Sequence, residues 1–211
     1  MPKKQDKRMK HDPERQPKPR LIVGMSGASG AIYGVRLLQK LKGSGIETHL
    51  IMSRNAQITL AHETDLKVAD VERLASVVHS NNDLGAACSS GSFRTLGMVV
   101  APCSIKTMGE IATGATASLI ARSADVAMKE RRRVVLMLRE TPLHLGHIRS
   151  MAAVTEAGAI VYPPVPALYA RPKSLDDMID YTLGRVLDLF DIDLGLAGRW
   201  TGARTRPERA T

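Results

Sequence analysis

Two kinds of hydrophobic pattern alternate along this chain. In the first, three to six neighbouring residues are mostly apolar or alternate with polar ones, which is typical of β-strands. Such runs predict five strands, at residues 21–23, 47–52, 98–101, 133–138 and 159–162. The run at 133–138 contains no polar break after Arg133, as expected of a strand that is covered on both faces.

In the second pattern, apolar residues recur every three or four positions, as the buried face of a helix requires. Val35, Leu38 and Leu41 follow this spacing directly after the first strand. The same spacing predicts further helices over about 53–65, 68–78, 105–112, 119–129, 144–156 and 174–190. Ser53 and Ser174 stand where the N-caps of two of these helices belong.

Alternation of strands and helices predicts an α/β protein with a Rossmann-like, mostly parallel, doubly wound sheet. Ligands of such sheets bind at the carboxyl ends of the strands. The residues that follow the strands are therefore candidates for the site, and they are 26–29, 53, 103–106, 139–140 and 163–169.

A loop of small residues, 26–30, separates the first strand from its helix. Small side chains let a ligand approach the backbone, and the first N–H groups of the helix are expected to point outward unpaired. This arrangement favours an anion such as a phosphate. An ordinary turn with a serine as the helix N-cap explains the same residues, and the spacing is not that of the G-x-G-x-x-G fingerprint.

Four basic residues, Arg122, Lys129, Arg139 and Arg185, lie on or beside elements that are expected to approach this same edge. A solvated helix face with local acidic partners is the alternative for Lys129 and its neighbours. Glu140 is either a proton acceptor or the ion-pair partner of Arg139.

Other catalytic patterns are weaker. The strand-end residues contain no Ser-His-acid triad, and Cys103 is expected to pack at a strand end rather than act as a nucleophile. His144 and His147 are three residues apart on one predicted helix, but two histidines without a carboxylate or cysteine at ligand spacing predict no metal site.

Composition agrees with one domain and a proper core. Of the 211 residues 44% are apolar but only 3% are aromatic, so aliphatic residues must fill the core. Cys88 and Cys103 are too few for a disulfide framework, which favours the cytoplasm. The apolar run after the basic N-terminus is too short for a signal peptide, and no run reaches the ~18 residues of a membrane span.

The net charge of +9 belongs to the two ends of the chain. Residues 1–20 carry a net +5 and residues 199–211 a net +3, which leaves +1 for residues 21–198. Polar, charged ends of this kind are typical of disorder. We therefore expect disordered basic tails at 1–19 and 203–211, a single domain over 20–202, and no nucleic acid or membrane partner.

The chain resembles the UbiX flavin prenyltransferase family. The resemblance is carried in order by residues 22–36 (IVGMSGASGAIYGVR), 47–53 (ETHLIMS), 89–93 (SSGSF), 102–107 (PCSIKT), 124–132 (ADVAMKERR) and 139–143 (RETPL). It continues through 163–169 (PPVPALY) and 174–178 (SLDDM), and it covers about residues 20–202. Residues 109–118, Arg149 and Ser150 match least closely.

The resemblance implies a three-layer flavoprotein fold, usually assembled as a dodecamer. It implies transfer of a dimethylallyl group from dimethylallyl monophosphate to N5 and C6 of reduced FMN, with release of phosphate and no metal. The prenylated FMN serves UbiD-type decarboxylases, including the one in ubiquinone biosynthesis. Proteins of this kind have also been described as aromatic-acid or octaprenyl-hydroxybenzoate decarboxylases.

The resemblance also implies roles for individual residues. Those that would bind FMN are Gly27, Ala28, Ser29, Ser53, Ser104, Ile105, Lys106, Thr107 and Arg139. Those that would bind the dimethylallyl phosphate are Arg122, Lys129, Tyr169 and Arg185. Those that would take part in the chemistry are Ser29, Glu63, Lys129 and Glu140.

Two other functions remain open at this stage. An FMN-dependent decarboxylase acting on a cysteinyl substrate would share the flavoprotein architecture. A non-enzymatic flavin carrier, or a nucleic-acid-associated module using the basic tails, would need none of the catalytic residues.

Overall fold

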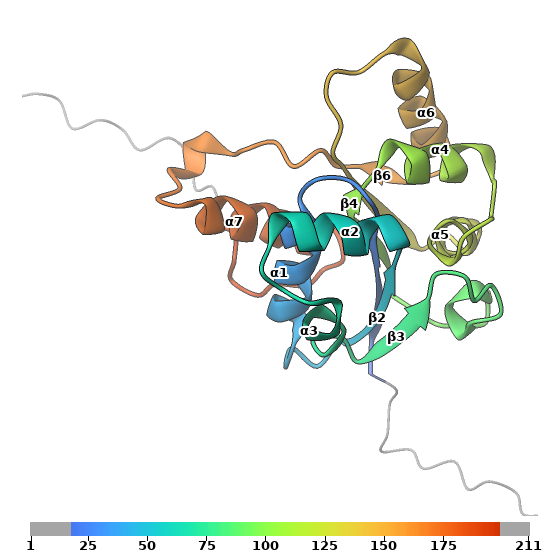
Figure 1. Ribbon diagram of the computed structural model, residues 1–211, viewed down its shortest axis with the longest axis horizontal. Coiled ribbons are helices and arrows are strands. Elements are labelled where there is room, and N and C mark those ends of the chain that lie inside the picture. Colours follow the sequence, from blue (N-terminus) through green and yellow to red (C-terminus); the bar gives the residue numbers. More distant parts are fainter. Residues whose placement is uncertain (1–17, 199–211) are drawn as a thin grey trace, which may run out of the picture.

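Six parallel strands form one sheet in the order β3-β2-β1-β4-β5-β6 (Figure 1). The computed structural model describes residues 18–198, so the expected tails lie almost entirely outside the described residues. The strands are β1 (Arg20–Met25), β2 (Glu47–Met52), β3 (Val77–Ser80), β4 (Gly97–Cys103), β5 (Arg133–Leu138) and β6 (Ile160–Val161). The prediction of a parallel, Rossmann-like α/β fold is confirmed.

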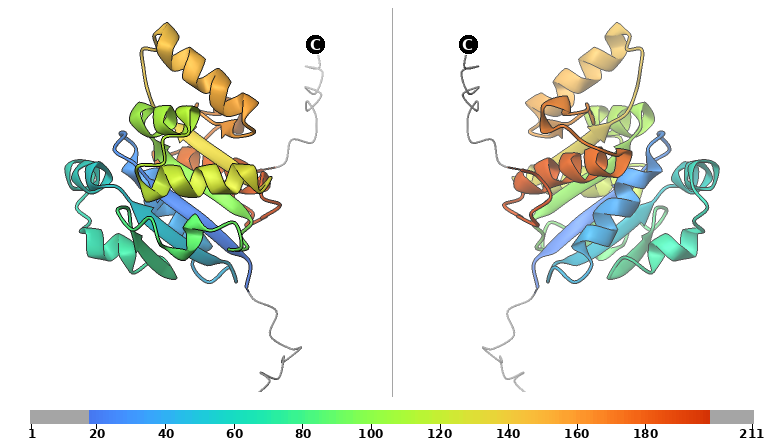
Figure 2. Two further views of the ribbon diagram at one scale, coloured as in Figure 1. Left: turned by 90° about the vertical axis from the view of Figure 1, so that its right-hand side faces the viewer. Right: turned by 90° about the vertical axis from the view of Figure 1, so that its left-hand side faces the viewer.

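Helices cover both faces of the sheet. They are α1 (Ala31–Leu41), α2 (Arg54–Glu63), α3 (Val68–Glu72), α4 (Ile105–Thr113), α5 (Leu119–Lys129), α6 (Leu145–Glu156) and α7 (Leu175–Asp188), with 3-10 turns η1 (Ala87–Ser89) and η2 (Leu168–Ala170). Figure 2 shows α1 and α7 on one face and α4 and α5 on the other, with α6 packed on α4. No helix among residues 18–198 combines the length and the apolar character that crossing a bilayer requires.

Successive residues of the central strands pack into two separate cores, because side chains alternate across a sheet. Leu21 and Val23 belong to the core beneath α1 and α7, whereas Ile22 belongs to the core beneath α4 and α5. All seven residues of β4 are buried. This rigid centre holds the loops at the carboxyl ends of β1 and β4 in place.

The strand order reverses between β1 and β4. From β1 the chain moves outward through β2 to β3, and it then returns to β4 and moves outward through β5 to β6. A crevice opens at such a switch point in doubly wound sheets, outside the carboxyl ends of the two strands. The topology therefore places the expected ligand between the loops that follow β1 and β4.

The prediction of a helix over 68–78 is wrong in its second half. Helix α3 ends at Glu72, and Val77–Ser80 is instead the edge strand β3. Just before this strand, the N–H of Ser76 donates to the carbonyl of Thr48 at 3.1 Å and so brings the chain alongside β2. Only four residues alternate between half-buried and exposed positions here, which is too short a run for its period to be recognised in the sequence.

Candidate functional site

The loops that follow β1, β2, β4 and β5 meet at one edge of the sheet. Backbone and side-chain hydrogen bonds join them pairwise: Ser53 N–H to the Met25 carbonyl at 2.9 Å, Ser104 N–H to Ser26 Oγ at 2.7 Å, and Arg139 N–H to the Cys103 carbonyl at 3.1 Å. The structure thus brings together Gly27, Ala28, Ser29, Ser53, Ser104, Ile105, Lys106, Thr107, Arg139 and Glu140. The ends of the strands predicted this gathering except for Thr107, which the family resemblance added, whereas Tyr169, which the same reasoning included, lies elsewhere.

The N-terminus of α1 is not the open anion site that its loop predicts. The carboxylate of Glu63, at the end of α2, accepts hydrogen bonds from the N–H groups of Gly30 and Ala31, each at 2.9 Å. The N-cap is Gly30, in the left-handed region with φ 101°, and no side chain caps the helix in the usual way. The expectation of unpaired N–H groups is therefore wrong, and so is the alternative of a serine N-cap.

Glu63 is held as a carboxylate. Burial alone would raise its pKa, but hydrogen bonds from the Ser29 hydroxyl and from the Ala31 and Gly30 N–H groups, together with the positive charge of Arg139, lower it. The helix dipole of α1 favours a negative charge at the same place. The Glu63 carboxylate therefore accepts from the Ser29 hydroxyl, which orients that hydroxyl, and it stays ionised near neutral pH.

The N-termini of α2 and α4 differ from that of α1. Ser53 caps α2 by accepting from the Ala56 N–H at 3.1 Å, which confirms the prediction of this cap. Ser104 caps α4 by accepting from the Thr107 N–H at 3.3 Å. Among the described residues, no acceptor faces the N–H groups of residues 105 and 106. The starts of α2 and α4 are therefore the anion sites that this edge leaves available.

Gly27 needs to be a glycine because α2 lies against it. A Cβ atom at this position would stand 2.4 Å from Cβ of Asn55, in the first turn of α2. Its neighbour Ala28 is 93% buried and adds no bulk to the edge. The small residues at 27 and 28 therefore let α2 pack closely against the loop after β1.

These groups fit a flavin mononucleotide. Ser53, the start of α4 and the Arg139 side chain offer hydrogen-bond donors and positive charge at this edge. The ammonium of Lys106 pairs with Glu110 at 2.6 Å, so its charge is already partnered. Ser29 and Glu63 lie at the same edge, and the charge of Arg139 acts on Glu63.

Lys129 is not at this edge, contrary to expectation. It ends α5 just before β5 begins, and its ammonium pairs with Glu130 at 2.8 Å. Its side chain lies beside Gly91, in the loop that precedes β4. Since Arg139 follows the other end of the six-residue strand β5, the sheet separates the two residues by about 17 Å.

Arg122 is at the carboxyl edge but near the outermost strand of its half. Helix α5 starts beneath β3, where the N–H groups of Leu119 and Ile120 donate to the Asn81 backbone and side-chain oxygens at 2.8 and 3.2 Å. The Arg122 guanidinium pairs with Asp125 at 3.5 Å. The single chain therefore does not bring Arg122 beside Arg139.

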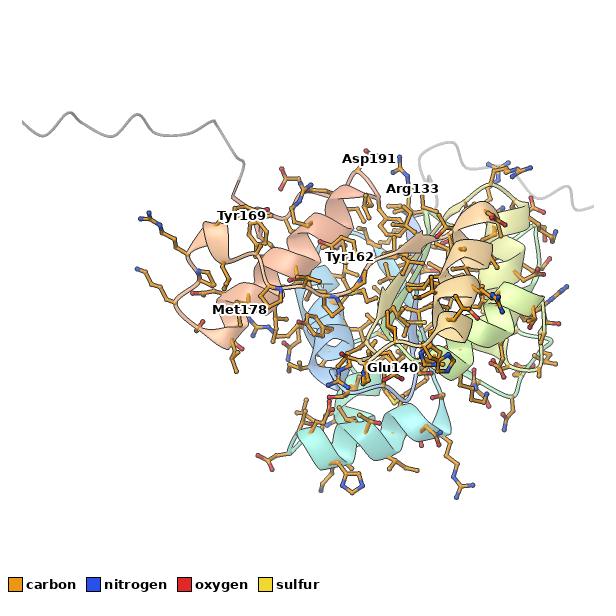
Figure 3. The ribbon with its side chains drawn as sticks, turned by 90° about the horizontal axis from the view of Figure 1, so that it is seen from above. Arg133, Glu140, Tyr162, Tyr169, Met178 and Asp191 are labelled. Atoms are coloured by element: carbon orange, nitrogen blue, oxygen red, sulfur yellow. The ribbon has the colours of Figure 1, made fainter. Side chains whose placement is uncertain are left out.

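Tyr169 and Arg185 belong to a separate group beside β6. The hydroxyl groups of Tyr169 and Tyr181 are 2.8 Å apart, and the two rings meet edge to face. Arg185 donates to Asp188 at 2.6 Å, and its charge acts on Tyr162, whose pKa burial raises. Figure 3 shows Tyr169 against α7, well away from Glu140.

Sequence analysis predicted no role for Tyr181, although its position relative to Arg185 offered a signal. It stands four residues before Arg185 on α7, and residues at that spacing share one face of a helix. The Tyr181 hydroxyl therefore lies on the same helix face as an arginine that was predicted to bind phosphate. This spacing was the signal that could have identified Tyr181. The sequence pattern likewise predicted no role for Ser26 beyond its place in the loop 26–30.

Cys103 is a buried, packed residue, whereas His144 is exposed and His147 is half-buried. Burial raises the pKa of the Cys103 thiol to about 12, so no thiolate is present near neutral pH and the nucleophile alternative fails. The rings of His144 and His147 lie 3.6 Å apart, centroid to centroid, at the start of α6. Within residues 18–198 no third histidine, cysteine or carboxylate joins them in a metal-binding group.

Sequence comparisons agree on one family. A family model described as Flavoprotein matches residues 9–187. A flavin prenyltransferase UbiX of Thauera aromatica is 57% identical over 187 residues, which cover 89% of this chain and 96% of the relative. A flavin prenyltransferase UbiX of Escherichia coli K12 is 58% identical over 187 residues, covering 87% of this chain and 99% of the relative.

Solved structures give the same picture. AnUbiX (PadA1), crystallised with FMN and dimethylallyl pyrophosphate, has a TM-score of 0.87 and 49% identity over 89% of this chain and all of its own. A dodecameric FMN-dependent UbiX-like decarboxylase from Escherichia coli O157:H7 has a TM-score of 0.84 and 46% identity, covering 87% of this chain. The FMN-dependent cysteine decarboxylase TvaF is only 16% identical at a TM-score of 0.57, so it shares the fold alone.

Proposed function

This chain belongs to the flavin prenyltransferase UbiX family, and from that premise we propose that it transfers a dimethylallyl group from dimethylallyl monophosphate to N5 and C6 of reduced FMN. The observation that carries the proposal is that the loops following β1, β2, β4 and β5 meet at one edge of the sheet. The N-termini of α2 and α4 lie there beside Ser29, whose hydroxyl donates to the ionised carboxylate of Glu63, and the charge of Arg139 acts on the same carboxylate. The helix N-termini suit the FMN phosphate, and the side of Ser29 and Glu63 suits the reacting ring.

Reduced FMN, when bound, supplies the electron-rich atoms that attack the allyl group, so the protein needs no nucleophile of its own. The task of this chain is to hold the flavin, exclude water and stabilise the departing phosphate. Gly27 packs against α2 and so fixes the loop that carries Ala28 and Ser29, while Ser104 and Thr107 set the start of α4.

An allylic phosphate ionises more readily when its leaving dianion is neutralised by fixed donors. Arg122, Lys129, Tyr169 and Arg185 are the donors that the family resemblance assigns to this step. Guanidinium, ammonium and phenol groups can perform it without a metal. In one chain they occupy three separate places, so we propose that neighbouring copies complete each site.

Glu140 is the proposed proton acceptor after bond formation. It follows β5 directly beside Arg139, it is exposed at the crevice edge, and its carboxylate accepts only the local Thr141 N–H at 3.0 Å. A positioned acceptor of this kind contributes roughly 10²–10⁴-fold in rate. Ser29 and Glu63 would orient the ring and relay protons from the loop that follows β1.

The first experiment tests the reaction. The protein is incubated under strict anaerobiosis with reduced FMN and dimethylallyl monophosphate, and in parallel with the pyrophosphate. We expect a flavin heavier by one prenyl unit and release of phosphate. Recovery of unchanged flavin and intact prenyl phosphate from the folded, FMN-binding protein would contradict the proposal.

The second experiment tests the shared site. We propose a dodecamer, which for chains of 22.9 kDa has a mass of about 275 kDa and can be identified by sedimentation. Lys129→Ala and Glu140→Gln should each be nearly inactive alone. Co-expressed in one oligomer, they should regain a measurable fraction of the activity, because some sites would then combine intact residues from two copies. No recovery in a proven mixed oligomer would place Lys129 outside a shared site.

We also propose that the enzyme works in the cytoplasm and passes its product to a UbiD-type decarboxylase. Support for the compartment comes from Cys88 and Cys103, which are both buried free thiols, as a reducing environment allows. Product transfer can be tested by adding the reaction mixture to such a decarboxylase lacking its cofactor. Activity should appear only when both FMN and the prenyl phosphate were supplied.

A further inference from the structure

Ser26 joins the two loops of the crevice. It follows β1 directly and its side chain is almost completely buried, with 1% exposure. Its Oγ donates to the carbonyl of Pro102 at 3.0 Å and accepts from the N–H of Ser104 at 2.7 Å. One hydroxyl thus uses both its donor and an acceptor position to join the end of β1 to the end of β4.

This link lies where the backbone ladder between the two strands ends. The β1–β4 pairing runs from Leu21↔Gly97 to Gly24↔Val100 and goes no further. Pro102 has no N–H and cannot donate to a continued ladder. Ser26 replaces the missing bonds, since its own N–H also donates to the Pro102 carbonyl, at 3.1 Å.

The two loops that Ser26 joins carry opposite parts of the proposed flavin site. Gly27, Ala28 and Ser29 follow Ser26 without interruption, and Ser104 both receives the Ser26 bond through its N–H and caps α4 through its side chain. We propose that Ser26 is a positioning residue, which sets the separation of the 27–29 loop from the start of α4 and thereby the fit of FMN. The proposal deepens the proposed function and rests on its FMN site.

Three variants test this role. Ser26→Ala removes the hydroxyl, Ser26→Thr keeps it, and Ser123→Ala removes an equally buried hydroxyl on α5 whose described contacts do not reach either loop. The readouts are amide hydrogen exchange of Ser104 in the protein without flavin, the affinity for oxidised FMN by fluorescence quenching, and unfolding in denaturant. None of them depends on prenyl transfer, so a failure of the proposed reaction leaves this test intact.

For Ser26→Ala we expect faster exchange of the Ser104 amide and roughly ten-fold weaker FMN binding, because a buried donor loses its acceptor. Ser26→Thr should stay within about three-fold of the original affinity, and Ser123→Ala should leave FMN binding unchanged. Unchanged Ser104 amide exchange and unchanged FMN affinity in Ser26→Ala would overturn the proposal. An equal loss of FMN affinity in Ser123→Ala would also overturn it. If Ser26→Ala does not fold, Ser26→Cys provides the same comparison, because its thiol is a weak acceptor.

Discussion

Two helices begin at the same edge of the sheet, and their N-termini are used in opposite ways. At α1 the N–H groups of Gly30 and Ala31 are already occupied by the Glu63 carboxylate. At α4 the Ser104 side chain accepts from the Thr107 N–H, and the N–H groups of residues 105 and 106 have no acceptor among the described residues. Both termini attract negative charge, but only the second is available to a ligand.

The difference teaches how one crevice can separate binding from chemistry. A helix N-terminus that carries its own carboxylate repels a second anion and holds that carboxylate ionised, as the lowered pKa of Glu63 indicates. We therefore expect a phosphate at the start of α4 rather than at α1, and the reacting part of the ligand toward Ser29. Substitutions on the two sides should accordingly alter different steps.

The largest expected effect lies on the α1 side. Glu63→Gln keeps an oxygen that can accept from the Gly30 and Ala31 N–H groups but removes the charge. We expect prenyl transfer to fall by roughly 10²-fold or more, while FMN affinity changes by less than about three-fold. Single-turnover rates and FMN titration measure the two quantities, and Glu72→Gln at the end of α3 is the control. Equal losses of the prenyl-transfer rate and of FMN affinity would contradict the claim that the N-termini of α1 and α4 serve different steps.

On the α4 side, Arg139→Ala should weaken FMN retention by about ten- to a hundred-fold, because a charged donor to the phosphate is lost. The flavin content after purification and the dissociation constant of FMN report the change. Arg133→Ala is a matched control, since Arg133 lies at the opposite end of the same strand and pairs with Asp191. Unaltered flavin content in Arg139→Ala would remove Arg139 from the phosphate site.

A smaller effect separates capping from binding. Ser104→Ala and Ser174→Ala each remove an N-cap hydroxyl, which accepts from Thr107 at 3.3 Å in α4 and from Asp177 at 3.1 Å in α7. Both should reduce the free energy of unfolding by about 1 kcal/mol. Only Ser104→Ala should also weaken FMN binding, by several-fold. If the two variants bind FMN equally well, the start of α4 does not hold the phosphate.

The smallest effect concerns pH. The pKa of Glu63 is lower in the folded chain than the value of about 4.3 expected when unfolded. Its contribution to stability is therefore complete above that value and is lost as the pH falls through the folded pKa. Because Glu63 is exposed, the contribution should stay below about 1 kcal/mol. Denaturant unfolding between pH 5 and 3 should consequently lose less stability in Glu63→Gln than in the original protein, and parallel curves would contradict this.

Much of the fold follows from local pattern. The predicted helix 119–129 and strand 133–138 have the observed bounds, because a hydrophobic period is a property of neighbouring residues. The gathering of residues 27–29, 53, 104–107 and 139–140 was also predictable, since parallel strands place their carboxyl ends at one edge. Motifs in the same segments identified the family.

Tertiary structure alone decided how the groups at this edge are paired. Glu63 is 33 residues from Gly30, and Ser104 is 78 residues from Ser26, so neither contact leaves a periodic signal in the sequence. Lys129 lies on the far edge because α5 runs back across the sheet before β5 begins. The local pattern therefore determined which elements form and which loops share an edge. The packing of those elements decided that the first helix is closed by a carboxylate and the fourth is left open.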